Sequence, residues 1–144
     1  MVEQDTIKLL RECDAGIKMG TAAIDDVLSR TESRDLHESL AGYKQEYNQL
    51  QDEMQILLDD YGDDGKEPSP IAKSMSWMKT NMKLSMEAGD ATITDLITDG
   101  CNMGVKSLNR YLNEYKAADE KSKDITKRLI NLMERQSHDI REYL

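Results

Sequence analysis

Apolar residues recur every three or four positions along most of the chain, the spacing of one face of an α-helix. The clearest example predicts a helix ending at Tyr61 and beginning near Leu36. Its apolar positions alternate by four and three without interruption: Leu36, Leu40, Tyr43, Tyr47, Leu50, Met54, Leu57 and Tyr61. This regularity predicts one continuous buried stripe.

The same spacing predicts three further long helices, at residues 6–30, 90–116 and 123–144. We expect Asp5 to cap the first, and Asp90 or Thr92 to cap the one that starts at 90. Their apolar sides comprise Ile7, Leu10, Ile17, Ile24 and Leu28; Ile93, Leu96, Ile97, Leu108, Tyr111, Leu112 and Tyr115; and Ile125, Leu129, Leu132, Ile140 and Tyr143. Only 2 Pro and 8 Gly interrupt the chain, which favours long helices over a sheet.

The strongest break lies at 62–65, Gly-Asp-Asp-Gly, and is followed by Pro68 and Pro70. A shorter helix is predicted from Ser69 to Ala88, with Gly89 ending it. At ~1.5 Å per residue this connection covers about 28 Å, enough for the second and third long helices to run in the same direction. We therefore expect one domain, 1–144, made of a hairpin at 5–61, a crossover at 62–89 and a hairpin at 90–144.

A short internal repeat supports two related hairpins. Gly16-Ile17-Lys18-Met19-Gly20 matches Gly100-Cys101-Asn102-Met103-Gly104 at an offset of 84 residues. The second arms match more loosely, Asp35-Leu36 against Asp124-Ile125. Paired small residues at mid-helix would let two helices approach closely.

With these hairpins, the repeat and the crossover motif Ser76-Trp77-Met78-Lys79, the chain resembles the ferritin-like superfamily. Within it, the chain is most similar to a bacterial group of small, uncharacterised four-helix proteins. The resemblance implies an all-α, ferritin-like four-helix bundle: two antiparallel helical hairpins joined by a long crossover that contains a short fifth helix.

The best-known chemistry of that superfamily is a di-iron site, which needs two Glu-x-x-His motifs. In this chain the residue three positions before each histidine is an arginine, not the required Glu: Arg34 before His37 and Arg135 before His138. Three positions after Glu46, where the motif requires His, the chain has Gln49. We therefore predict no catalytic, cofactor-binding or metal-binding residues and no cofactor, and we lean against an enzyme.

Several polar residues fall on apolar stripes: Asp14, Thr21 and Gln136, with Glu46 beside the Tyr43/Tyr47 stripe. They could form a polar layer that fixes helix register. Alternatively, Asp14, Glu46 and Gln136 could be the remnant of a carboxylate site suited to Mg²⁺, Ca²⁺ or Mn²⁺. We favour the register layer, and we interpret Glu134 and His138 as a surface pair rather than metal ligands.

Cys13 and Cys101 lie in helical sequence without a neighbouring base, so we interpret them as buried small residues rather than redox groups. Met75, Met78, Met82 and Met86 share a stripe on the crossover helix near Trp77. Such a stripe could bind copper or a partner helix, but it is more typical of adaptable packing. The exposed side of this helix is also a candidate dimerisation surface.

The formal net charge is −9. An acidic surface repels phosphate backbones and anionic lipids, so neither nucleic acid nor a membrane is an expected partner. The chain has no signal-like N-terminus, no apolar run near 18 residues and no glycine-rich phosphate loop, and we expect it in the cytoplasm. The sequence favours a non-catalytic scaffold or protein-interaction module, with a homodimer or an unknown protein as its partner. The alternative is a metal-binding ferritin-like protein with a degenerate carboxylate site.

Overall fold

In the computed structural model, residues 2–66 and 89–144 are described, and they contain helices and no strands. The α-helices are α1 (Val2–Leu28), α2 (Arg34–Asp60), α4 (Asp90–Glu114) and α5 (Glu120–Ile140), and a short 3₁₀ helix, η1 (Arg141–Tyr143), follows α5. None of the described helices combines the length and the apolar character that crossing a bilayer requires. The predicted crossover helix, with Trp77 and its methionine stripe, lies outside the described residues.

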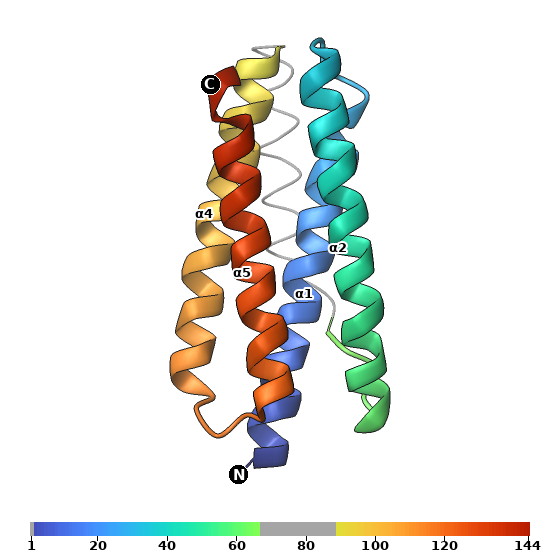
Figure 1. Cartoon of the computed structure of the whole chain (residues 1–144), viewed down its shortest axis with the longest axis vertical. Helices are drawn as coiled ribbons and strands as arrows, with labels where there is room; N and C mark the ends of the chain where they lie inside the picture. The colour runs from blue at the N-terminus through green and yellow to red at the C-terminus, as the bar shows by residue number, and fades with distance from the viewer. Residues whose placement is uncertain (1, 67–88) are drawn as a thin grey trace.

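The four α-helices pack side by side around one core (Figure 1). Going round the bundle, α1 contacts α2, α2 contacts α5, α5 contacts α4, and α4 contacts α1. Every one of these neighbouring pairs is antiparallel, since α1 and α5 rise in the view while α2 and α4 descend. The helices α1 and α5 also contact each other across the diagonal.

The helix α2 confirms the prediction from its apolar stripe. The stripe from Leu36 to Met54 is buried throughout. Past that point the core residue is Leu58 rather than the predicted Leu57, which is only partly buried. Ser33 caps the helix, because its hydroxyl accepts a hydrogen bond from the backbone N–H of Leu36 at 3.2 Å.

Neither predicted cap of α1 and α4 acts as a cap. The helix α1 already includes Val2, and Asp5 lies inside its first turn. Likewise Asp90 is the first residue of α4, and its N-cap, Gly89, has no side chain to bond. The predicted helix at 123–144 instead begins at Glu120, where Asp119 accepts from the N–H of Ser122 at 2.8 Å.

The two displaced acidic residues join the hairpins at opposite ends of the bundle. The carboxylate of Asp90 accepts from the backbone N–H groups of Glu32 and Ser33 in the α1–α2 loop, both at 2.8 Å. At the other end, Asp5 accepts from the N–H of Ala117 in the α4–α5 loop at 3.0 Å. An offset of 85 residues separates Asp5 from Asp90 and Glu32 from Ala117, one more than the offset of 84 in the sequence repeat.

The second glycine of each repeat is the position of close packing. A Cβ on Gly20 would lie 3.3 Å from the ring of Tyr47, and a Cβ on Gly104 would lie 2.5 Å from the sulfur of Met133. The contacting residues on the second arms, Tyr47 and Met133, are 86 positions apart. These contacts relate the second arms at an offset of 86, whereas the looser sequence pairing of Asp35 with Asp124 has an offset of 89.

Candidate functional site

Asp14 is buried, as its place on the α1 stripe predicts, and it bonds to one residue on α1 and one in the segment after α2. Its carboxylate lies 2.7 Å from the ammonium of Lys18 and accepts from the backbone N–H of Lys66 at 3.0 Å. Gly65 stands directly against it with φ +87°, and a Cβ there would overlap the carboxylate. Asp14 therefore anchors the chain that leaves α2 onto the side of α1.

Gln136 lies in the core at a different height. Its side-chain oxygen accepts from the hydroxyl of Tyr47 at 2.8 Å and from the thiol of Cys101 at 3.4 Å. Cys13, the neighbour of Asp14, contacts Thr126, which lies ten residues before Gln136 on α5. Ten helical residues correspond to about 15 Å, so Asp14 and Gln136 do not share a layer.

Glu46, the third predicted member, lies on the surface and pairs with Arg135 at 3.1 Å. The structure thus separates Asp14, Glu46 and Gln136. A polar layer does exist, but Gln136 forms it with Tyr47 and Cys101, one side chain each from α5, α2 and α4. Three helices bonded at one level hold their heights relative to one another.

Both cysteines are buried and unbridged, in agreement with the sequence interpretation. Burial raises the pKa of the Cys13 thiol to about 12, and this effect outweighs a hydrogen bond with Thr126 that lowers the pKa. Burial likewise raises the pKa of Cys101 to about 12, and a hydrogen bond with Tyr47 opposes it. Both thiols are therefore protonated at neutral pH, which makes them poor nucleophiles.

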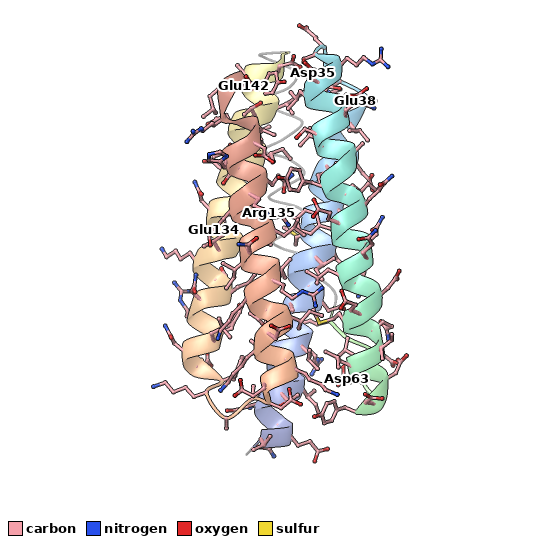
Figure 2. All side chains as sticks on the ribbon, in the orientation of Figure 1. Asp35, Glu38, Asp63, Glu134, Arg135 and Glu142 are labelled. Atoms are coloured by element: carbon pink, nitrogen blue, oxygen red, sulfur yellow. The ribbon has the colours of Figure 1, made fainter. Side chains whose placement is uncertain are left out.

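The histidines take local partners. His37 lies near the start of α2, as predicted, and its ring nitrogen is 3.0 Å from both the carbonyl of Leu28 and the hydroxyl of Thr31. His138 is exposed and lies 3.4 Å from Asp139, and Glu134 is exposed one turn earlier on α5 (Figure 2). Within residues 2–66 and 89–144, no group of three or more His, Cys, Asp or Glu side chains could hold a metal ion.

A groove lies between α2 and α5, and we call it the α2–α5 groove. It comprises two adjoining hollows of about 380 and 310 Å³ that share Glu53 and Arg128. The upper hollow is lined by Glu46, Gln49, Leu50, Glu53, Lys127, Arg128, Asn131, Leu132 and Arg135. The lower hollow is lined by Glu53, Ile56, Leu57, Lys121, Asp124, Ile125 and Arg128. Its floor is apolar and its walls are charged.

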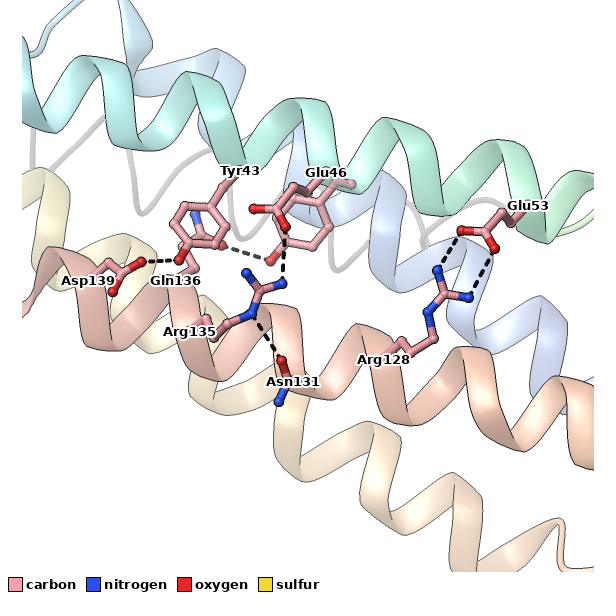
Figure 3. Close-up of polar contacts among 9 residues, drawn as sticks. Tyr43, Glu46, Glu53, Arg128, Asn131, Arg135, Gln136 and Asp139 are labelled. Carbon is pink, nitrogen blue, oxygen red and sulfur yellow. Dashed lines mark hydrogen bonds and ion pairs between the residues drawn. The ribbon is translucent and has the colours of Figure 1, made fainter.

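Two ion pairs span the groove (Figure 3). The guanidinium of Arg128 donates to both carboxylate oxygens of Glu53, at 3.0 and 2.6 Å, which is the fork geometry that arginine favours. This hydrogen bonding lowers the pKa of Glu53 and raises that of Arg128. Arg135 donates to Glu46 at 3.1 Å and also lies 6.0 Å above the ring of Tyr43.

The charged pairs across the groove were not identified from the sequence, although a signal exists. Glu46 and Glu53 are seven residues apart on α2, and Arg128 and Arg135 are seven apart on α5. Oppositely charged residues at heptad spacing beside an apolar stripe mark the flanks of a helix–helix contact. The pairing itself could not be read, because it needs α2 and α5 to be neighbours.

Comparisons with known proteins do not add to this picture. No protein-family model, no curated protein and no solved structure matches the chain.

Proposed function

We propose that this chain is a non-catalytic helical scaffold or protein-interaction module that self-associates, built on a ferritin-like frame. The observation that carries the proposal is the α2–α5 groove, which has an apolar floor and oppositely charged walls held on two packed helices. Charges arranged in this way favour association with a complementary surface and define its orientation.

The directions of the helices support the ferritin-like part of the proposal. The second and third long helices, α2 and α4, both descend in Figure 1, so the end of α2 and the start of α4 lie toward opposite ends of the bundle. This is the relation between the two hairpins that ferritin-like folds join with one long crossover. The repeated clamps of Asp5 and Asp90 at opposite ends also support two related hairpins.

Rigidity supports the interaction part of the proposal. The groove residues lie on helices whose heights are held by the Tyr47–Gln136–Cys101 layer and whose ends are clamped by Asp5 and Asp90. Binding to a preformed surface loses little conformational entropy, so more of the contact energy appears as affinity.

Sedimentation equilibrium over roughly a hundredfold range of protein concentration tests the proposal. We expect the weight-average mass to rise from that of one chain toward that of two. A mass of one chain at every concentration, with no protein recovered on the immobilised chain, would refute it.

The alternative, a metal-binding protein with a degenerate carboxylate site, has weaker support. Asp14 is the buried carboxylate such a site would use, but the ammonium of Lys18 already neutralises it at 2.7 Å. Elemental analysis of protein purified without chelators decides between the two. A stoichiometric metal that is lost in an Asp14→Ala variant would favour the alternative.

A further inference from the structure

Building on the proposed self-association, we propose that a second copy of this chain docks on the α2–α5 groove. In this dimer the two-fold axis runs parallel to the helices, and α2 of each copy lies over α5 of the other. The dimer would be parallel, with the same end of both bundles pointing the same way.

The charge of the groove is divided between its two walls. The α2 wall contributes two charged residues, Glu46 and Glu53, and both are acidic. The charged residues of the α5 wall are mainly basic: Lys121, Lys127, Arg128 and Arg135, with Asp124 as the one acid that α5 contributes to the lining. The groove therefore offers net positive charge on one side and negative charge on the other, although the chain as a whole carries −9.

A surface divided in this way complements a copy of itself in only one orientation. A two-fold axis parallel to the helices exchanges the sides of the groove and keeps the heights, so the acidic wall meets the basic wall. Glu53 and Arg128 lie at one height, since they form a two-pronged pair. Each Glu53 would then face Arg128 of the other copy. An axis across the helices would instead place α2 over α2, acid against acid.

The lower hollow adds an apolar contact. Ile56 is 64% exposed, and it lines this hollow together with Leu57 and Ile125. The other large apolar residues that are similarly exposed in the described chain, Val2, Met103 and Leu144, do not line the groove. In the parallel dimer, Ile56 of each copy lies over the Ile125 side of the other and can enter its hollow.

The upper end of the same face limits the contact. Asp35 on α2 and Glu142 after α5 lie toward that end (Figure 2), and like charges would meet there. The favourable section runs from Glu46 to Ile56 and measures about 15 Å by two helix widths, ~20 Å. A footprint this small belongs with weak, transient interfaces. We therefore expect a concentration-dependent dimer that added salt weakens, because exposed charges are screened.

Charge reversal tests the surface and its orientation. Glu53→Lys alone places two cations opposite each other in the dimer, and Arg128→Glu alone places two anions there. We expect each variant to dimerise at least tenfold more weakly than the unchanged protein. Mixed in equal amounts, the two variants should form a heterodimer, since the two substituted side chains then face each other with opposite charges and the retained Glu53 faces the retained Arg128. The double variant should dimerise with itself.

Asp52→Lys is the matched control, because Asp52 is an exposed α2 residue outside the groove lining. It makes the same charge change and should leave dimerisation within about twofold of the unchanged protein. Circular dichroism checks that each variant is folded. If a charge-reversal variant does not fold, Glu53→Gln or Arg128→Gln is tested in its place, and we expect it to dimerise more weakly than the unchanged protein.

The outcomes separate this inference from the proposed function. If the unchanged protein dimerises but Glu53→Lys and Arg128→Glu dimerise equally well, the groove is not the interface and self-association stands. If the variants are weakened but their mixture stays monomeric, the parallel orientation is wrong. If the unchanged protein is monomeric at every concentration, the self-association in the proposed function fails together with this inference.

Discussion

Tyr47 and Gln136 should behave as one energetic unit. Both are almost fully buried, with 1% and 2% of their surfaces exposed, and the Tyr47 hydroxyl donates to the Gln136 oxygen at 2.8 Å. Two substitutions separate the partners: Tyr47→Phe removes the donor, and Gln136→Met removes the acceptor with little change of volume. Each single change leaves a buried polar group without its partner, whereas the double change removes both groups.

The expected magnitudes follow from what each change leaves behind. After Tyr47→Phe, the Gln136 oxygen keeps only the thiol of Cys101 at 3.4 Å, a weak donor, so the cost is about 1–2 kcal/mol. After Gln136→Met, the phenol and the thiol both lose the Gln136 oxygen and keep only their weak hydrogen bond with each other, which costs about 1–3 kcal/mol. In the double variant both the donor and the acceptor of this hydrogen bond are absent, so neither is buried without a partner. Its free energy of unfolding should fall by only about 0–1 kcal/mol. The coupling is then at least about 1 kcal/mol.

Urea unfolding followed by circular dichroism, at one low protein concentration, measures the free energy of unfolding of the four proteins in this cycle. Tyr61→Phe combined with Gln136→Met is the control. Tyr61 bonds to Asp119 at 3.1 Å near the opposite end of α5, so these effects should add within about 0.5 kcal/mol. If the effects of Tyr47→Phe and Gln136→Met also add, the two residues do not share a buried hydrogen bond and our reasoning about the layer is wrong.

Two further predictions concern stability. Gly65→Ala should lower the free energy of unfolding by about 1–3 kcal/mol, because φ at Gly65 is +87° and the new Cβ would meet the Asp14 carboxylate. Gly42 lies inside α2 with open space around it, so Gly42→Ala should raise the free energy of unfolding by up to ~1 kcal/mol. Urea unfolding compares the two, and equal effects would contradict this account. The pKa of Asp119 is lowered, since hydrogen bonds from Ser122 and Tyr61 outweigh the effect of burial. Its stabilisation is therefore present above the unfolded value near pH 3.9 and is lost as pH falls through the lower, folded pKa. Urea midpoints between about pH 6 and pH 3 should fall more steeply for the unchanged protein than for Asp119→Asn, and parallel curves would count against this role.

The helices could be predicted from the sequence because their apolar stripes are local signals. The stripe of α2 needs only the spacing from Leu36 to Met54, and each of its positions is buried in the structure. The helix starts were less predictable. Asp5 and Asp90 have the composition of capping residues, but each bonds to a loop of the other hairpin instead. A long-range partner of this kind has no local signature.

The candidate site was less predictable for the same reason. The stripes correctly indicated that Asp14 and Gln136 are buried, but heptad position does not give height in an assembled bundle. Height depends on how α1 and α5 are staggered, and the contact of Cys13 with Thr126 sets that stagger. The pairs across the groove, such as Glu53 with Arg128, need in addition the order of helices round the bundle, which separate helix patterns do not contain.

The middle of the bundle and its surface hold different kinds of polar group. In the core, burial raises the pKa of the Tyr47 phenol and of the Cys101 thiol, so both are neutral at physiological pH and bond to the neutral amide of Gln136. Such a layer orders helices but neither attracts a charged ligand nor donates a proton readily. The formal charges that line the groove lie instead at the surface, where Glu53 and Arg128 are each about half exposed. Charges that remain hydrated can exchange partners at little cost in desolvation. Recognition of another surface is therefore better served by the groove than by the interior of the bundle.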